Sequence, residues 1–484
     1  MQFVPDASGT VDACAQGKSL PSHAAALPGA GGAGVGEEDA GVDESGTALA
    51  PDLQPAKPEA VRRALARAGH IGTNLRASVR RLMAALAARG EHEVSRIRAR
   101  FHSPLHSEWL AAVMGITLGV SFTVCFVTGM VDYLAQHSPS WFHLPVHPVN
   151  FFRVTEGVHV LTGIIAIPLV LAKLWVVYPN FFAYPPVRSV AHALERISLV
   201  PLVGGALFEL ATGIANIAYW YSPMPFNFTV AHFYVAWITI GGLIVHIGAK
   251  LSLTRDVVSG RHGRAAKGMV TNTEVIVAAK PAVAAGLDRR GFLAAVGGGA
   301  GVLLLTVAGE TVAPLRDLAL LAPRNPTVGP QSLPVNKTAH GAGVIEQAMS
   351  ADYRLVVGGK CRHPRSFSLD ELRSLPQRGA GLPIECVEGW SAAAAWRGVS
   401  LPMLLEMVGA PKGSKVMVQS IESESQLYSN SVIDPEHAAD PDTLLALELN
   451  GEVLDLDHGF PIRLIAPDRP GVLQTKWLRQ VTVL

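Results

Sequence analysis

Five long apolar runs constrain this chain of 484 residues more than any other feature. A helix needs about 20 mostly apolar residues to cross a bilayer, and each run is long enough to do so. Only 16% of the residues are charged, against roughly 25% in a typical soluble protein. We therefore expect a membrane protein, with spans at Trp109–Leu134, Val154–Tyr178, Ile197–Tyr219, Val230–Leu253 and Phe292–Ala313.

The grouping of these runs predicts a multidomain chain with an all-α membrane bundle. The first four runs fall within residues 105–255 and predict a four-helix domain. The fifth, within residues 288–314, predicts a separate anchoring span. Residues 256–287 lie between them and are expected to form a cytoplasmic linker.

Positive charge gathers on one side of the predicted spans. Ten arginines lie between Arg62 and Arg100, and eight Lys or Arg residues lie between Lys250 and Arg290. The loops after the first and third spans hold only Arg153. Because loops rich in Lys and Arg stay in the cytoplasm, we expect a multi-pass protein of the plasma (cell inner) membrane. Its N-terminus would be cytoplasmic and its C-terminal domain extracytoplasmic.

The first 100 residues are expected to form a cytoplasmic tail. Residues 1 to about 60 are rich in Ala, Gly, Pro, Asp and Glu without lasting periodicity, which predicts disorder. The arginine-rich remainder has helical spacing and would lie at the membrane surface, or else form a solvated charged helix. The net charge of the whole chain is only +1, so we expect no nucleic-acid partner.

The fifth run opens with a pattern typical of twin-arginine export. Arg289 and Arg290 are followed by a one-residue spacer and then by Phe292 and Leu293, before a Gly-rich apolar stretch. The twin-arginine translocase moves folded proteins, which suits a domain that takes up its cofactor before crossing. The alternative is the ordinary positive flank of a membrane span.

The last 160 residues, 325–484, show a different pattern. A proline-containing linker is followed by short strand-like segments with helices between them, which predicts an α+β domain. The expected helices are Ser368–Ser374 and Pro402–Val408, and the expected strands are Tyr353–Val357, Pro383–Cys386, Lys415–Ser420, Pro461–Ala466 and Arg479–Leu484.

The four cysteines form no CxxC pair, so neither a disulfide framework nor a zinc site is expected. Cys386 ends a predicted strand ahead of a Gly-containing turn. A thiolate at that place is a soft metal ligand, although free cysteines are often simply buried. From the residues alone, both interpretations stay open.

This domain resembles the sulfite oxidase-type molybdopterin domain in six ordered blocks. They are Val335–Thr338, Cys386–Trp390, Trp396–Val399, Leu444–Glu452, His458–Leu464 and Lys476–Leu478. The resemblance implies that Cys386 ligates molybdenum beside the dithiolene of one molybdopterin. It also implies oxygen-atom transfer on a small substrate.

The same resemblance implies roles for five further residues. Asn336, His458, Arg463 and Lys476 match positions that bind the cofactor. Tyr428, which we expect in a short strand at Leu427–Ser429, matches a pocket tyrosine with a catalytic role. Sulfite oxidases of animals and plants carry an arginine just before the asparagine of the first block. Val335 stands there in this chain, which puts sulfite as the substrate in doubt.

The second and fourth predicted spans carry histidines near their ends. His232 and His246 are 14 residues apart, which places them about 40° apart around a helix and about 21 Å apart along it. His159 lies near the outer end of the second span. This pattern resembles the cytochrome b-like subunits of formate dehydrogenases, which implies b-type haem. His159 and His232 would ligate an outer haem. His246 would ligate an inner haem, for which the usual partner from the first span is missing. His106 and His192, which lie just before the first and third spans, are the candidates.

Together these features predict a molybdopterin-dependent oxidoreductase that exchanges electrons with the quinone pool through membrane haem. Two alternatives remain at this point. The membrane domain could be a haem-free anchor, or the C-terminal domain could be a binding module without cofactor.

Overall fold

The computed structural model describes most of the chain after residue 102. From there on it leaves out residues 104, 183–188, 221, 223–225, 260–286, 323, 425 and 427; before it, only 59, 78–85, 88–90, 92 and 93 are described, all helical. Contacts divide the chain into units of residues 1–89 and 90–484. The predicted disordered tail and most of the predicted linker lie outside the described residues.

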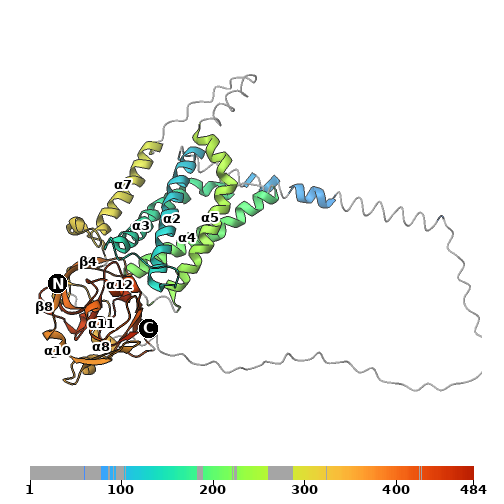
Figure 1. Ribbon diagram of the computed structural model, residues 1–484. Coiled ribbons are helices and arrows are strands. Elements are labelled where there is room, and N and C mark those ends of the chain that lie inside the picture. Colours follow the sequence, from blue (N-terminus) through green and yellow to red (C-terminus); the bar gives the residue numbers. More distant parts are fainter. Residues whose placement is uncertain are drawn as a thin grey trace, which may run out of the picture. The chain divides into compact units, whose positions relative to one another are not determined.

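Five helices in the described part of the chain are long and apolar enough to cross a membrane (Figure 1). They are α2 (Glu108–His137), α3 (Phe151–Val177), α4 (Val190–Ile217), α5 (Phe228–Val258) and α7 (Arg289–Ala308). α2 packs on α3, α4 packs on α5, and α7 packs on α3. The five predicted apolar runs therefore correspond to five candidate membrane helices.

Many apolar side chains of these helices point away from the protein. Val120 is 59% exposed, Leu171 60% and Ile244 66%. Such faces would be costly in water, whereas hydrocarbon accepts them. The exposed apolar surface is therefore consistent with a bilayer around the helices.

Two of the helix boundaries that differ from the sequence-based expectation have a local explanation. α4 begins at Val190 and includes His192, because Ser189 caps the helix by accepting a hydrogen bond from the His192 amide at 3.1 Å. α7 ends at Ala308, before the expected Ala313. A Cβ at Gly309 would lie 2.5 Å from the Leu315 carbonyl oxygen, so this glycine permits a tight turn into the 3-10 helix η3 (Ala313–Leu318).

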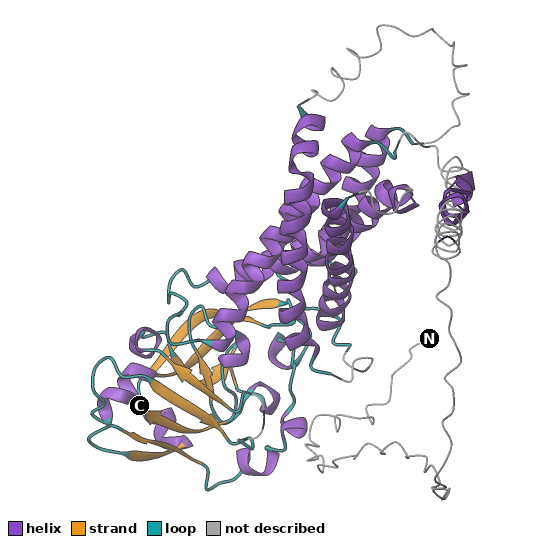
Figure 2. Cartoon of the chain, turned by 90° about the vertical axis from the view of Figure 1, so that its right-hand side faces the viewer, coloured by secondary structure: helices purple, strands orange, loops and turns teal. Residues whose placement is uncertain are grey.

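The strands all belong to the C-terminal domain and form two five-stranded sheets (orange in Figure 2). The first sheet has the order β2-β1-β10-β5-β6, with β1 and β10 parallel. The second has the order β3-β4-β7-β8, and β9 pairs with β7. The strands are β1 (Arg354–Gly359), β2 (Arg365–Ser368), β3 (Gln377–Glu385), β4 (Ser391–Ser400), β5 (Val416–Ser420), β6 (Asn430–Ile433), β7 (Leu444–Leu449), β8 (Glu452–Val453), β9 (Arg463–Ile465) and β10 (Leu478–Val483).

Alternating burial along the strands builds two hydrophobic cores, of which the first takes side chains from both sheets and the second from the sheet that contains β3, β4 and β7. In β5, Val416 and Val418 are fully buried while Met417 between them is partly exposed, as expected for a strand with one face inward. The first core also takes in α10 (Leu369–Ser374) and α11 (Leu401–Met407). The second contains Cys386 and Trp390. The five predicted strands and both predicted helices of this domain are confirmed, whereas the further short strand expected around Tyr428 is not.

Candidate functional site

Cys386 sits in the turn that joins β3 to β4. Its amide donates to the Trp390 carbonyl at 3.0 Å, and the Gly389 amide donates back to the Cys386 carbonyl at 3.0 Å. Gly389 has a φ of +92°, a conformation that glycine adopts without strain. This closed turn holds the Cys386 side chain, which is only 4% exposed, in a fixed position.

A small pocket opens beside this cysteine. Four of the residues predicted as cofactor ligands line it: Asn336, Cys386, Arg463 and Lys476. Asn336 Nδ2 lies 3.6 Å from Cys386 Sγ and donates to it. The other lining residues are Pro334, Ile384, Trp390 and Gly471. Residues up to 142 positions apart (334 to 476) are therefore brought to one place.

Arg463 is a buried cation in this pocket. Its Nη1 donates to the His458 carbonyl at 3.3 Å, and its guanidinium lies 5.4 Å from the ring centre of Trp396. Its Nε is buried and, among the described residues, has no hydrogen-bond partner. Burial lowers the pKa of Arg463 to about 10. An unpaired buried donor of this kind calls for an anionic or acceptor ligand.

Lys476 is the second buried cation. Its Nζ donates to the carbonyl oxygens of Lys337 at 2.9 Å and Asp457 at 2.7 Å. Burial, with the nearby charge of Arg463, lowers its pKa to about 7. A Cβ at Gly459 would lie 3.1 Å from Arg463 Cβ and 3.2 Å from Lys476 Cβ. The lack of a side chain at Gly459 therefore allows Arg463 and Lys476 to approach each other closely. Two cations this close favour an anion between them.

These residues fit an anionic molybdopterin. Cys386 offers a soft sulfur ligand, and Arg463 and Lys476 offer the positive charge that a phosphate or dithiolene needs. In the described part of the chain, no three His, Cys, Asp or Glu side chains gather as they would around a bare metal ion. A single protein ligand matches a metal whose other ligands come from the cofactor.

The comparisons with known proteins agree with this geometry. Residues 341–484 match the family model described as "Oxidoreductase molybdopterin binding domain". This part of the chain is a molybdopterin-binding oxidoreductase domain.

Parts of this chain are also similar to curated proteins and to a solved structure. A "Putative protein-methionine-sulfoxide reductase subunit YedZ1" of Azospira oryzae is 32% identical over 30% of this chain and 53% of its own length. "Sulfite oxidase" of Arabidopsis thaliana is 29% identical over 34% of this chain and 50% of its length. The sulfane dehydrogenase SoxCD of Paracoccus pantotrophus is 26% identical over 28% of this chain and 38% of that chain, with a TM-score of 0.26. The chain thus spans about half the length of the curated relatives it matches.

His458 lies behind the pocket of the molybdopterin domain and is not among the residues that line it. It is 1% exposed, and its Nε2 is 2.8 Å from the Pro330 carbonyl oxygen. Burial, together with the charge of Arg463, lowers its pKa to about 4, which keeps the ring neutral. Because its own carbonyl holds Arg463, His458 is placed to orient that cation, and its direct contact with the cofactor stays a prediction.

Tyr428 corrects the sequence-based placement. We expected it in a strand, but it lies in a turn just before β6, with a φ of +66°. Its side chain is 47% exposed and is not among the residues lining the pocket. Residues with positive φ break strand pairing, which explains why β6 begins only at Asn430. A catalytic role for Tyr428 stays a prediction.

A polar cluster beside the pocket was missed by sequence reasoning. Tyr219 donates from its hydroxyl to the Asn336 carbonyl at 2.8 Å, and the guanidinium of Arg324 lies 4.7 Å from the ring centre of Tyr219. Arg324 is also 3.7 Å from Glu388, which accepts a hydrogen bond from Trp390 Nε1 at 3.2 Å. Tyr219 follows α4 and is 117 positions from Asn336. A contact between residues so far apart cannot be predicted from local sequence patterns.

The Cys386 turn rests on the membrane helices. Asn216 Nδ2, near the end of α4, donates to the Val387 carbonyl at 2.9 Å, and Thr311 Oγ1 donates to the Gly389 carbonyl at 3.1 Å. A Cβ at Gly389 would lie 3.0 Å from a methyl carbon of Val160 and 3.2 Å from one of Ile217. The turn that carries the candidate molybdenum ligand is therefore packed on α3 next to His159.

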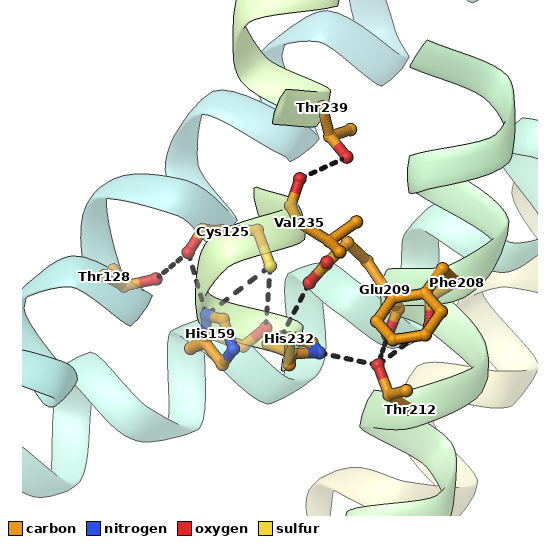
Figure 3. A network of polar contacts seen from close by, with 9 residues as sticks. All are labelled: Cys125, Thr128, His159, Phe208, Glu209, Thr212, His232, Val235 and Thr239. Carbon is orange, nitrogen blue, oxygen red and sulfur yellow. Dashed lines mark hydrogen bonds and ion pairs between the residues drawn. The ribbon is translucent and has the colours of Figure 1, made fainter. Parts of the chain in front are cut away.

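His159 and His232 face each other between α3 and α5 (Figure 3). Their ring centres are 6.3 Å apart, with an angle of 77° between the rings. A metal ion coordinated by both imidazoles would hold their ring centres about 6 Å apart, because each metal–nitrogen bond is about 2 Å long and each nitrogen lies roughly 1 Å from its ring centre. The observed separation is close to this value. His159 Nδ1 is 2.8 Å from the Cys125 carbonyl oxygen, which fixes the ring and leaves Nε2 for a metal.

Unlike His159, His232 has a hydrogen-bond or ion-pair partner among the described residues at both ring nitrogens. Its Nδ1 is 2.7 Å from Thr212 Oγ1, and its Nε2 is 3.0 Å from Glu209 Oε2 (Figure 3). Ligation through Nε2 would displace Glu209. The Nε2 atom of His159 is thus placed to coordinate a metal, whereas that of His232 could do so only if its ion pair with Glu209 opened.

The surroundings of His246 are charged. Lys173, Lys250 and Glu195 are the charged groups that act on it, and Lys250 Nζ pairs with Glu195 Oε1 at 2.6 Å. Its Nδ1 is buried and, within the described residues, has no hydrogen-bond partner. Two cations beside the ring disfavour a ferric iron at that position. The ligation of an inner haem by His246 and His192 stays a prediction.

Proposed function

We propose that this protein is a membrane-bound oxidoreductase whose extracytoplasmic molybdopterin domain performs oxygen-atom transfer on a small substrate. The bound molybdenum would supply the two-electron oxygen-transfer chemistry. Cys386 would ligate it, Asn336 would donate a hydrogen bond to that sulfur, and Arg463 and Lys476 would neutralise the anionic cofactor. The observation that carries this proposal is the meeting of these four side chains in one pocket.

We infer that sulfoxides are better substrate candidates than sulfite. Val335 stands where sulfite oxidases of animals and plants carry an arginine of their anion pocket, so one cation that would hold a dianionic substrate is lost. A neutral sulfoxide needs less compensating charge. The relative named as a protein-methionine-sulfoxide reductase subunit points in the same direction.

We further propose that b-type haem between His159 and His232 exchanges electrons with the quinone pool. The support is the 6.3 Å separation of the two rings, together with the packing of the Cys386 turn on Val160, the neighbour of His159. Electrons would cross only this short stretch of packed protein between membrane and pocket.

Export by the twin-arginine translocase belongs to the same proposal. Arg289 and Arg290 begin α7, and Asp288 caps it by accepting a hydrogen bond from the Gly291 amide at 2.7 Å. A domain that takes up its cofactor in the cytoplasm has to fold before it crosses. The twin-arginine motif at the start of α7 would direct the C-terminal domain across the membrane after it has folded around its cofactor.

The test is an assay on the intact protein in membranes. Sulfoxides, N-oxides and sulfite are offered in turn, and the rate of reoxidation or reduction of the b-type absorbance is followed. We expect a sulfoxide to reoxidise the dithionite-reduced haem in wild type. A haem signal that no oxygen-atom donor or acceptor alters would contradict the proposed electron route.

The contact between His232 and Glu209 favours a second candidate, a molybdopterin enzyme with a haem-free membrane anchor. An imidazole held by a carboxylate at 3.0 Å is already satisfied without iron. A reduced-minus-oxidised spectrum of purified membranes separates the two candidates, because only the first gives a b-type band. Metal analysis separates both from a cofactor-free binding module, which would contain no molybdenum.

A further inference from the structure

An apolar pocket of about 190 Å³ lies among α3, α4 and α7. Its walls are aliphatic throughout: Ile164, Ile167, Ile214, Ile217, Ala218, Leu303, Val307 and Leu321. Two helices of the four-helix domain and the fifth helix contribute to it. α7 is therefore a wall of this pocket as well as an anchor.

The pocket is closed toward the protein and open toward its surroundings. Ile164, Ile217 and Val307 are 8%, 8% and 6% exposed, so they form a floor. Ile214 and Leu321 are 44% and 59% exposed and stand at the rim. Since these helices are candidate membrane spans, an occupant would enter sideways from the bilayer.

Polar groups that are not themselves among the lining residues follow Val307, the lining residue nearest to them in the chain. The Glu310 amide donates to the Val307 carbonyl at 3.0 Å, and Glu310 Oε1 accepts from the Arg324 amide at 2.9 Å. Glu310 is 1% exposed and Ser391 2%. Among the described residues, Glu310 Oε2 and Ser391 Oγ are buried without a hydrogen-bond partner. The Ser391 amide donates to the Glu310 carbonyl at 3.1 Å, so the two unsatisfied groups belong to one corner.

The pocket borders both candidate redox sites. Ile217, in the pocket floor, is one of two residues that a Cβ on Gly389 would meet, at 3.2 Å, so the Cys386 turn packs against a wall of the pocket. On α4, Gly213 next to Ile214 lies against His232, because a Cβ there would be 4.0 Å from the ring. A molecule in the pocket would therefore lie close to the proposed haem.

We propose that this pocket binds a quinol, with its isoprenoid tail against the aliphatic walls and its ring toward Glu310 and Ser391. The occupant has to be apolar, to come from the bilayer and to carry a polar end that accepts or donates hydrogen bonds, and a quinol meets all three requirements. This inference rests on the proposed function, which requires such an electron partner.

A quinol that becomes a quinone releases two electrons and two protons. A b-type haem held by His159 and His232 would supply one-electron acceptor chemistry between the quinol and the molybdopterin site. The Glu310 carboxylate would take up and release the two protons one after the other. Burial raises the pKa of Glu310 to about 7, within the range where a carboxyl exchanges protons at neutral pH. Substrate oxidation would run the same step in reverse.

The test fills the pocket by Leu303→Trp and compares it with Val302→Trp, a neighbour on the same helix that is 62% exposed. Full-length protein in vesicles of defined phospholipid receives either decyl-ubiquinol or a quinol without a tail. The rate of haem reduction is divided by the rate with reduced viologen in the same sample. For Leu303→Trp we expect decyl-ubiquinol to reduce haem about tenfold more slowly than in the control, which corresponds to about 1.4 kcal/mol.

The tail-free quinol separates the two parts of the site. It should be slowed little by Leu303→Trp but clearly by Glu310→Gln, which keeps the size of the side chain and removes its exchangeable proton. Equal rates for Leu303→Trp and Val302→Trp with decyl-ubiquinol would overturn the pocket assignment and would indicate that a phospholipid chain fills this space. If wild-type haem is not reduced by any quinol, the proposed function itself fails; if it is reduced and the variants behave alike, only this inference fails.

Discussion

Asn216, near the C-terminal end of α4, donates a hydrogen bond from Nδ2 to the carbonyl oxygen of Val387 over 2.9 Å. Val387 directly follows Cys386, so a membrane helix holds the loop that carries the candidate molybdenum ligand. This contact joins the two halves of the proposed electron route, and it is the reason to treat the membrane helices and the molybdopterin domain as one functional unit.

Asn216→Ala is expected to slow electron transfer between haem and substrate by about fivefold, because a net hydrogen bond of about 1 kcal/mol no longer holds the Cys386 turn. Stopped-flow reoxidation of the reduced haem by substrate measures this rate. Asn227→Ala is the matched control, since Asn227 caps α5 through the Val230 amide. An equal slowing in both variants would mean that general loosening of the helices is responsible.

Arg463→Gln is expected to weaken retention of the cofactor by about 10- to 100-fold, because a hydrogen bond to a charged group contributes about 1.5–3 kcal/mol. Release of pterin during dialysis, followed by fluorescence, measures the loss. Arg397→Gln serves as the control, since Arg397 is exposed and pairs with Glu448 at 3.3 Å. Unchanged retention in Arg463→Gln would remove this cation from the cofactor site.

His159→Ala is expected to abolish the b-type absorbance while molybdenum stays bound, because the two groups have separate ligands. His246→Ala should leave the outer haem signal in place, given the lysines beside that ring. His137→Ala, whose ring lies 2.8 Å from its own helix carbonyl at Tyr133, is the control. Loss of half the haem in His246→Ala would instead support an inner haem.

The buried pair of Asp434 and His437 predicts an acid-sensitive domain. Burial alone would raise the pKa of Asp434, but hydrogen bonds from His437, at 2.6 Å, and its charge lower that pKa below the usual range. A depressed carboxyl pKa contributes stability above the unfolded value of about 3.9, and that stability is lost as pH falls below it.

Asp434→Asn should therefore lower the free energy of unfolding at pH 7 by about 1–2 kcal/mol, since Asp434 also caps α12 (Pro435–Ala439). The difference from wild type should shrink toward pH 3. Thermal unfolding of the detergent-solubilised protein at several pH values measures it, with Asp370→Asn, 94% exposed at its side chain, as control. A difference that does not depend on pH would contradict the ion pair.

Hydropathy predicted the candidate membrane helices well because each is a continuous local signal. Resemblance located Asn336, Cys386, Arg463 and Lys476, and the fold then placed them in one pocket. Tyr428 was assigned to a strand because its neighbours suit β structure. Its positive φ, which keeps it out of β6, could not be predicted from the residue types around it.

The contacts of the membrane helices with the C-terminal domain could not be predicted. In the sequence, Glu310 looks like a polar residue near the end of the fifth span. The structure shows that it is buried beside Ser391. The ion pair of His232 with Glu209 likewise joins two helices whose register the sequence leaves open. Such contacts depend on how distant segments pack, and single-sequence patterns carry no information about that.

The central claim is that Cys386 holds molybdenum, and metal analysis of the purified full-length protein tests it most directly. Cys386→Ser is compared with wild type and with Cys361→Ser, since Cys361 packs beside the first core, outside the pocket. We predict close to one molybdenum per chain in wild type and in Cys361→Ser, and its loss in Cys386→Ser with the domain still folded. Wild-type protein without molybdenum, or undiminished molybdenum in Cys386→Ser, would contradict the account.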